Sequence, residues 1–328
     1  MTDMDAWTQA HYGGVEQVVR TRVTVPEPGA GEALLRIRAV GLNAADRHLM
    51  TGEPLILRGM FGWSRPRQSV RGIDVAATVV ALGAPGDQQI AVGDEVVAEL
   101  PGGGGLAEYA VAPLSRLVPR PEHVDPVVAA ALPIAGGTAW QALDRAAVAS
   151  GHRVLVLGAS GGVGTFAVRL AALRGAEVHA LCSARNRGLV TSIGATEVHD
   201  RAVVSLADLP EGAFDAVVDI AGDSPLRAVQ RVVRDGGCAV LIAGEGGRLV
   251  GPLPRIARAS LLSIGSRRKL HPLAAVARTD ILRELLALAA AGSLQPVIER
   301  TWPLADAQGA LAHLAAGHTV GKVVVTVG

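Results

Sequence analysis

The chain has 328 residues, of which 49% are hydrophobic, and its formal net charge at pH 7 is +1. This length predicts two domains with a large core, and the near-zero charge gives no basic field for nucleic acid and no cationic surface for a membrane. The two cysteines, Cys182 and Cys238, lie in separate apolar runs and do not indicate a disulfide framework or a zinc site. The acidic N-terminus lacks an apolar signal core, and no apolar run is long enough to span a membrane, so we expect a cytoplasmic protein.

Short strands separated by turns dominate the first 120 residues or so. Strands are expected at 18–25, 33–40, 75–82, 94–100 and 107–112. Turns rich in proline and glycine follow the first and fourth of these strands. Strand spacing without intervening helices predicts a β-rich, partly barrel-like lobe. A proline-rich stretch at 119–126 breaks the pattern and marks the expected boundary of this lobe.

Strands and helices alternate in the rest of the chain. Helices are expected at 127–132 and 138–149, and strands at 154–157, 177–182, 216–220 and 237–242. This alternation predicts an α/β domain with a doubly wound parallel sheet of the Rossmann type. The last part is expected to form an apolar helix at 280–290, a strand at 297–300, a helix at 304–316 and a strand at 322–327.

A glycine cluster at the end of the first strand of that sheet is the most informative motif. It has the pattern A-x-G-x-x-G, with Ala159 where the commoner fingerprint has its first glycine. Gly161 would let a pyrophosphate approach the backbone, and Gly164 would let the next helix pack close to the strand. The first helical N–H groups and the helix dipole would hold the negative charge. We therefore predict a dinucleotide-binding turn, the alternative being a turn that only joins a strand to a helix; its residues are Gly158, Ala159, Ser160, Gly161, Gly162, Val163 and Gly164.

The end of the second strand predicts which dinucleotide is bound. A unit that binds NAD carries an acidic residue about 20 positions after the glycines, where it holds the ribose 2′-hydroxyl. Here the strand ends at Cys182 and is followed by Ser183, Arg185 and Arg187, with no carboxylate. Arginine pairs with phosphate oxygens through a planar fork of donors, so the sequence predicts NADPH over NADH. A solvated pair of arginines in an arginine-rich chain is the alternative.

Further motifs extend over nearly the whole chain in a characteristic order. They lie at 12–14, 26–32, 41–46 (G-x-N-x-x-D), 72–74, 92–96, 107–109, 129–133, 136–139 and 321–325. Together with the glycine turn, they show that the chain resembles the zinc-independent quinone oxidoreductase branch of the medium-chain dehydrogenase/reductase superfamily. Two departures bear on the shape of the pocket: Ala44 replaces the family's usual proline, and residues 67–71 are more polar than usual.

The resemblance implies a domain organisation. A GroES-like catalytic domain of residues 1–124 and 296–328 would receive, as an insertion, an NADPH-binding Rossmann domain of residues 125–295. Many proteins of this kind are homodimers, and a homodimer is therefore expected. The expected partner is a small-molecule substrate, not nucleic acid or a membrane.

The resemblance also implies roles for individual residues. Asn43 would lie near the nicotinamide and the substrate with Asp46 in the same turn, and Tyr12 would be a donor at the cleft. The alternatives are that Asn43 and Asp46 only form the turn and that Tyr12 packs at the surface. The remaining cofactor contacts would come from Thr138 at the nicotinamide carboxamide, Lys322 in the tail motif and Arg201 near the adenine and the 2′-phosphate. The alternative for Lys322, one of only two lysines, is a surface position.

No metal site is expected. Alcohol dehydrogenase relatives hold a catalytic zinc with Cys, His and Cys or Asp, and a structural zinc with four cysteines, whereas this chain has no cysteine before residue 182. The histidines at 11, 48 and 123 are scattered and are expected to be solvated or packed. The predicted reaction is therefore the NADPH-dependent reduction of a conjugated carbonyl compound, a quinone or an enone.

Two other functions stay open. One is an enoyl-thioester reductase of polyketide or fatty-acid type, and the other is an NADPH-binding sensor that lacks turnover. A basic stretch bears on the first, because it would contact a phosphate or carboxylate of a carrier-bound substrate or else form an ordinary solvated helix face; it contains Arg255, Arg258, Arg267, Arg268 and Lys269. Leu249, Leu253 and Ile256 would line a pocket beside it or simply pack.

Overall fold

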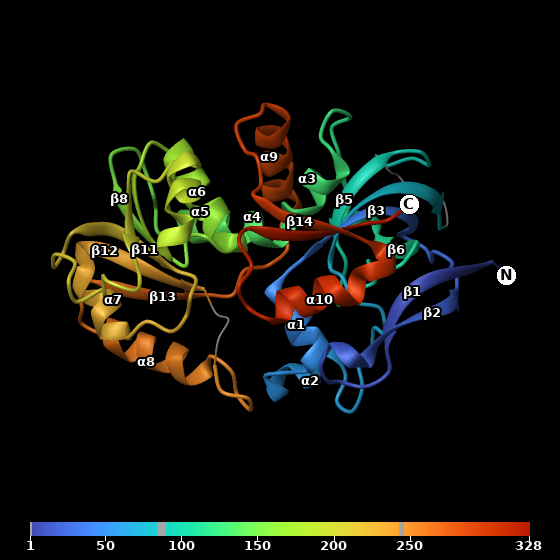
Figure 1. Ribbon diagram of the computed structural model, residues 1–328, viewed down its shortest axis with the longest axis horizontal. Helices are drawn as coiled ribbons and strands as arrows, with labels where there is room; N and C mark the ends of the chain where they lie inside the picture. Colours follow the sequence, from blue (N-terminus) through green and yellow to red (C-terminus); the bar gives the residue numbers. More distant parts are fainter. Residues whose placement is uncertain (1, 84–89, 243–245) are drawn as a thin grey trace. The chain divides into compact units, whose positions relative to one another are not determined.

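The computed structural model describes residues 2–83, 90–242 and 246–328 (Figure 1). The chain divides into two compact units. Unit 1 comprises Met1–Ile134 and Ala277–Gly328, and unit 2, Ala135–Val276, is inserted between these two segments.

The two divisions fall at 134/135 and 276/277, whereas the sequence placed the domain boundaries at 124/125 and 295/296. The difference comes from two helices that the sequence assigned to the Rossmann domain. Helix α3 (Pro126–Ala130) packs on strands β3 (Glu32–Leu42) and β4 (Asp74–Leu82), and α9 (Thr279–Ala290) packs on β7 (Val118–Pro119) and α3. Both helices therefore belong to unit 1.

Unit 1 is built around a seven-stranded, mainly antiparallel sheet. The order along it is β14-β15-β3-β4-β5-β7, and β6 also pairs with β3. The other strands of this sheet are β5 (Glu95–Glu99), β6 (Tyr109–Pro113), β14 (Ile298–Pro303) and β15 (Lys322–Thr326). The C-terminal strand β15 thus pairs with β3, with Val323 opposite Leu42. This pairing brings the two ends of the chain together in one sheet.

A separate antiparallel pair, β1 (Asp3–Gln9) and β2 (Val18–Thr24), joins this sheet through a shared core. The helices of unit 1 are α1 (Ala44–Thr51), α2 (Arg58–Phe61), α3, α9 and α10 (Ala307–Ala315), and α4 (Pro133–Arg145) begins there. Helix α1 packs on α10. The sequence did not predict β1 or α1.

Unit 2 contains a six-stranded parallel sheet in the order β10-β9-β8-β11-β12-β13. Its strands are β8 (Arg153–Leu157), β9 (Glu177–Cys182), β10 (Glu197–Asp200), β11 (Phe214–Asp219), β12 (Val233–Ile242) and β13 (Lys269–Leu273). Since β8 is the first strand of the sheet in chain order, the order reads 3-2-1-4-5-6, that of the doubly wound dinucleotide-binding fold. The predicted Rossmann-type sheet is therefore confirmed.

The helices of unit 2 lie in two layers. Helices α5 (Gly162–Leu173) and α6 (Arg187–Ser192) lie on one face of the sheet, and α7 (Leu226–Val232) and α8 (Leu253–Ser263) lie on the other (Figure 1). The reason is that the connections between parallel strands are right-handed and run in opposite directions from the centre of the sheet. In α5, Phe166, Ala167 and Leu170 are buried against the sheet. Because all six strands are parallel, their carboxyl ends share one edge, and the strand order reverses between β8 and β11.

Candidate active site

The turn between β3 and α1 is held by the carboxylate of Asp46. Asp46 Oδ2 accepts a hydrogen bond from the backbone N–H of Asn43 at 2.8 Å, and Oδ1 accepts one from the N–H of Gly72 at 3.1 Å. The side chain is fully buried. Asp46 therefore fixes the start of α1 and ties it to the segment before β4, so the turn-forming role considered for this residue is present.

Asn43 links the turn to the C-terminal strand. Its amide nitrogen donates to Gly41 O at 3.1 Å and to Asp74 Oδ2 at 2.9 Å, and its amide oxygen accepts from Lys322 Nζ. Both N–H groups of the Asn43 amide are thus engaged by the protein. In this geometry the side chain positions its neighbours and offers a ligand no donor.

Lys322 is not the surface lysine that was one alternative, because only 2% of it is exposed. Its Nζ also donates to Leu42 O at 2.9 Å and lies 4.0 Å from Asp74 Oδ2. Asp74 is fully buried and accepts a further hydrogen bond from the N–H of Ile134 at 3.1 Å. We call Asn43, Asp46, Asp74 and Lys322 the buried polar cluster.

Burial is the largest influence on the titratable groups of this cluster. It raises the pKa of Asp46 to about 6, against the lowering effect of its hydrogen bonds and of the Lys322 and Arg71 charges. Burial also raises the pKa of Asp74 well above its usual range and lowers the pKa of Lys322. The attraction between Lys322 and Asp74 opposes both of these shifts.

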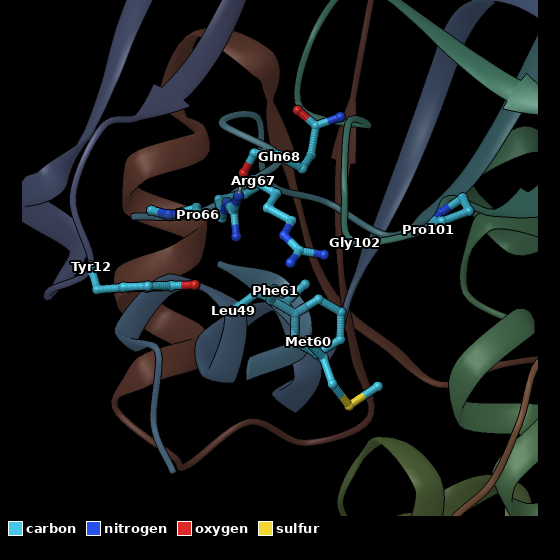
Figure 2. Close-up of a pocket in the computed structure, with 10 residues that line it drawn as sticks. Tyr12, Leu49, Met60, Phe61, Pro66, Arg67, Gln68, Pro101 and Gly102 are labelled. Carbon is cyan, nitrogen blue, oxygen red and sulfur yellow. Dashed lines mark hydrogen bonds between the residues drawn. The ribbon is translucent and has the colours of Figure 1, made fainter. Parts of the chain in front are cut away.

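Unit 1 also contains a cavity of about 300 Å³. It is lined by Tyr12, Leu49, Met60, Phe61, Pro66, Arg67, Gln68, Arg71, Pro101 and Gly102, which include two arginines and no acidic residue. Figure 2 shows the Tyr12 ring entering from one side, with the Phe61 ring of α2 facing it. Leu49 is carried by α1, the helix whose start Asp46 holds.

Arg71 lines this cavity, although the sequence did not single it out. Only 1% of it is exposed; its Nη2 donates to Gln68 O, and its buried Nε has no partner within the described part of the chain. Burial lowers the pKa of Arg71, and the negative charge of Asp46 opposes that shift. The only sequence signal was the unusual polarity of residues 67–71.

Tyr12 lines the same cavity. Its hydroxyl donates to Gly62 O at 2.7 Å, and the guanidinium carbon of Arg58 lies 4.5 Å from the centre of its ring. Burial raises the pKa of Tyr12 although the charges of Arg58, Arg71 and Arg67 lower it. The phenol is therefore in its neutral form, with its proton directed to Gly62.

In unit 2, the glycine cluster has the geometry of a phosphate cradle. Gly158 has a φ of 79° and makes the tight turn after β8, one residue earlier than the position that the motif assigned to Ala159. A Cβ on Gly164 would lie 2.1 Å from Gly158 O, so α5 can approach β8 only with glycine there. A Cβ on Gly161 would meet only Gly158 O, at 3.5 Å. The N–H groups of Gly162, Val163 and Gly164 are at the helix start, where no intrahelical acceptor exists.

The carboxyl ends of β9 and β10 bring the predicted cations together. Cys182 pairs with Asp200 across these strands, and the N–H of Arg201 donates to Cys182 O at 2.9 Å. The charges of Arg187 and Arg201 both lower the pKa of the Cys182 thiol, although burial raises it overall, so both guanidinium groups act at this strand end. Ser183, Arg185, Arg187 and Arg201 are at least partly accessible to solvent. The Asp200 carboxylate accepts from the N–H of Ala202 within its own turn.

Thr138 and the basic stretch have different surroundings. Thr138 is buried in α4.

The basic stretch is engaged in ion pairs. Arg255 forms an ion pair of 2.7 Å with Asp219, which is fully buried at the end of β11, while Arg268 pairs with Glu211 and Asp235. Lys269 begins β13 and is not part of a helix face. Most of this stretch therefore serves ion pairs within unit 2.

Comparison with known proteins identifies the family. Residues 29–122 match the alcohol dehydrogenase GroES-like domain, and residues 193–325 match the zinc-binding dehydrogenase family. The chain is 36% identical over 329 residues to a chloroplast envelope quinone oxidoreductase homolog of Arabidopsis thaliana, covering 96% of each chain. It belongs to the quinone oxidoreductase branch of the medium-chain dehydrogenase/reductase superfamily.

Two further relatives of this quinone oxidoreductase family agree with that assignment. One is the NADPH-dependent alkenal/one oxidoreductase, chloroplastic, of Arabidopsis thaliana, which is 30% identical over 336 residues, covering 98% of this chain and 79% of the relative. The other is the structure of the quinone oxidoreductase from Coxiella burnetii, with a TM-score of 0.87, 25% identity and full coverage of both chains. The chain is thus an oxidoreductase with this fold.

The GroES-like match spans the turn at Asn43 and most of the cavity lining, which places both in the GroES-like part of this quinone oxidoreductase family member. Within the described residues, no helix has the length and apolar character needed to cross a membrane.

Proposed function

We propose that this protein is an NADPH-dependent reductase that uses a conjugated carbonyl compound, a quinone or an enone, as its hydride acceptor. The observation that carries the proposal is the pair of strand ends in unit 2, where Ser183 and the exposed guanidinium groups of Arg187 and Arg201 occupy the place of the acidic residue of NAD-binding units. Arginine forks suit a 2′-phosphate. The relative named NADPH-dependent alkenal/one oxidoreductase supports the same choice.

The glycine turn fits the diphosphate of such a cofactor. The space beside Gly161 leaves the backbone open to a phosphate, whereas the contact at Gly164 is filled by the packing of α5 on β8. The N–H groups of Gly162, Val163 and Gly164 would bind the phosphate oxygens. When bound, the nicotinamide supplies the hydride. Thr138 would contact the nicotinamide carboxamide, and Lys322 would contribute a further contact to the cofactor.

We place the acceptor in the cavity of unit 1. Its apolar lining from Leu49, Met60 and Phe61 suits a quinone or enone ring system. The guanidinium of Arg71, which lines the cavity, would stabilise the negative charge that develops on the carbonyl oxygen, because a preorganised donor is worth more in a desolvated site than in water. Arg71 stays protonated throughout, so it stabilises charge and the proton is taken from solvent.

Asn43 and Asp46 would act by positioning. They hold the start of α1, which carries Leu49 of the cavity, and their donors and acceptors are engaged by the protein. Tyr12 would bind the acceptor through its ring, since its hydroxyl proton is already directed to Gly62. Unit 1 has no cysteine to build the zinc sites of the alcohol dehydrogenase relatives, so the proposed reaction uses no catalytic metal.

The basic stretch was the sequence feature in favour of a thioester substrate, and most of it is engaged within unit 2. Arg255 and Arg268 are held by Asp219, Glu211 and Asp235, so they are engaged within unit 2. The expected homodimer is proposed from the resemblance alone, and sedimentation of the purified protein would test it.

The test is a steady-state comparison of NADPH and NADH with a panel of quinones, enones and enoyl thioesters. We expect the double variant R187A/R201A to raise the KM for NADPH at least tenfold, about 1.4 kcal/mol, while the KM for NADH changes little. The control is Arg227→Ala, which removes another exposed arginine of unit 2. Equal use of both cofactors by the wild type would refute the 2′-phosphate site. Tight NADPH binding without turnover on any acceptor would favour the sensor, and turnover restricted to thioesters would favour the thioester reductase.

A further inference from the structure

Two neighbouring strands of unit 2 carry the same short pattern, glutamate followed two residues later by histidine. Strand β9 has Glu177 and His179, and the edge strand β10 has Glu197 and His199. Residues two apart on a strand face the same side of the sheet, and the register places His179 beside Glu197. The four side chains therefore gather on one face at the edge of the sheet.

Two of the distances among these side chains match those of metal ligands, and the contact between His199 and Glu197 is longer, at 3.7 Å from Nδ1 to Oε1. His179 Nδ1 lies 3.4 Å from His199 Nε2 and 3.2 Å from Glu197 Oε2. A tetrahedral Zn²⁺ bound at ~2.0–2.1 Å from each ligand separates the ligand atoms by about 3.3 Å. These three groups also form the one set of three or more His, Cys, Asp or Glu ligands with close ligand atoms in the part of the chain that the structure describes.

Glu177 completes the arrangement from behind His179. Its Oε1 lies 2.8 Å from His179 Nε2, so Nε2–H donates to this carboxylate and leaves the lone pair of Nδ1 directed at His199 and Glu197. Metal-bound histidines almost always donate their other ring N–H to such a partner. Arg153 lies on the far side, 3.4 Å from Glu177 Oε1 and 3.3 Å from His179 Nε2, so its charge is directed to Glu177 and not to Glu197.

We propose that His179, Glu197 and His199 bind a Zn²⁺ ion, with the fourth position open to solvent. Two imidazoles and one carboxylate are ligands that suit zinc better than magnesium or calcium. Access comes from the solvent side: His179 has a side chain 3% exposed and His199 13%, but Glu197 is 55% exposed. The ion would join the edge strand β10 to β9. This site is separate from the zinc sites whose absence the sequence predicted, and it differs from the expectation that the chain holds no metal.

The site is independent of the proposed reductase chemistry, because none of its ligands is a proposed cofactor or acceptor contact. Binding of the metal can therefore be measured without turnover. A failure of the zinc site would leave the proposed function unchanged, and a failure of the reductase proposal would leave the zinc site unchanged.

The experiment uses the full chain stripped of metal with a chelator and then titrated with Zn²⁺ by calorimetry and with Co²⁺ by visible absorption. We expect one ion per chain, an absorption spectrum typical of tetrahedral Co²⁺, and a higher melting temperature with Zn²⁺. His199→Ala and Glu197→Gln should each weaken binding at least tenfold, and Glu177→Gln should weaken it about 10–100-fold through the orientation of His179. His318→Ala removes an exposed histidine elsewhere and should bind as the wild type does.

Circular dichroism of each metal-free variant verifies that it is folded. The proposal is overturned if the wild type takes up no stoichiometric ion, if E197Q and H199A bind as tightly as the wild type, or if the cobalt spectrum is octahedral.

Discussion

Replacing Lys322 by methionine tests whether the buried polar cluster holds unit 1 together. Methionine keeps most of the side-chain length but removes the ammonium, which donates to Leu42 O and Asn43 Oδ1 and faces Asp74 at 4.0 Å. Each buried acceptor left without a donor costs about 1–3 kcal/mol. Breaking a buried ion pair by removing one partner costs about 3–5 kcal/mol. Because the two contributions overlap, we expect a loss of about 3–5 kcal/mol in the free energy of unfolding at pH 8.

The size of this loss should depend on pH through Asp74. Without Lys322, the folded-state pKa of Asp74 rises further above its unfolded value, so the folded variant binds a proton that the unfolded chain has released. A carboxyl group shifted in this direction lowers stability as the pH rises from the unfolded pKa through the folded pKa. The penalty of Lys322→Met should therefore be smaller at pH 5 than at pH 8, because the protonated Asp74 no longer needs an opposite charge.

Urea unfolding followed by tryptophan fluorescence is a suitable assay, since Trp7, Trp63 and Trp302 lie in unit 1 and only Trp140 in unit 2. The control is Lys269→Met, the other lysine of the chain, which is exposed and donates to Ser263 O. It should change the unfolding free energy by less than about 1 kcal/mol. The reasoning is refuted if both variants are destabilised equally, or if the penalty at Lys322 is as large at pH 5 as at pH 8.

Four other variants have specific expected outcomes. Gly164→Ala places a Cβ 2.1 Å from Gly158 O and should lower the free energy of unfolding by about 1–3 kcal/mol. Gly161→Ala has room in the free protein and should instead weaken NADPH binding at least tenfold, as measured by fluorescence titration. Asp46, with its pKa raised to about 6, should lower stability by up to ~3 kcal/mol as the pH rises from 4 to 7, and Asp46→Asn should remove most of that slope in urea titrations. Tyr12→Phe loses the hydrogen bond to Gly62 and should cost about 1 kcal/mol of stability while kcat falls less than tenfold; a much larger fall in kcat would make the phenol a proton donor.

The parts of the fold that follow from local patterns could be predicted from the sequence. The strand β9 was predicted with its observed bounds, and β8 within one residue, because β-branched and apolar runs flanked by turn residues are local signals. The glycine turn was also predicted as a unit. Its tight bend lies at Gly158 and not at the position of Ala159, since a positive φ is a property of the backbone that the motif alone does not locate.

Strand β13 was missed for a physical reason. It lies at the edge of the sheet, and of its five residues only Leu270 is buried, so it lacks the apolar run that indicates a strand of a parallel sheet. The charges of Arg267, Arg268 and Lys269 therefore indicated a helix face. The partners of Arg267 and Arg268, Asp235 and Glu211, come from other segments of the chain, and such pairing between distant segments is not visible in a local pattern.

Burial of a charged residue is the feature that sequence reading predicts least well, since arginine and lysine are exposed by default. Arg71 and Lys322 nevertheless share a signal, because each is next to a glycine at which the fold allows no side chain. A Cβ on Gly72 would lie 2.8 Å from Val40 Cγ1, and one on Gly321 would lie 2.2 Å from Val297 O. A glycine of this kind lets two segments approach closely, and at Gly72 and Gly321 the neighbouring charged residue lies in the core. Lys269 has no glycine neighbour and is exposed. In this chain, then, the charged residues adjacent to close-packed glycines are the ones to test first for a role in the site.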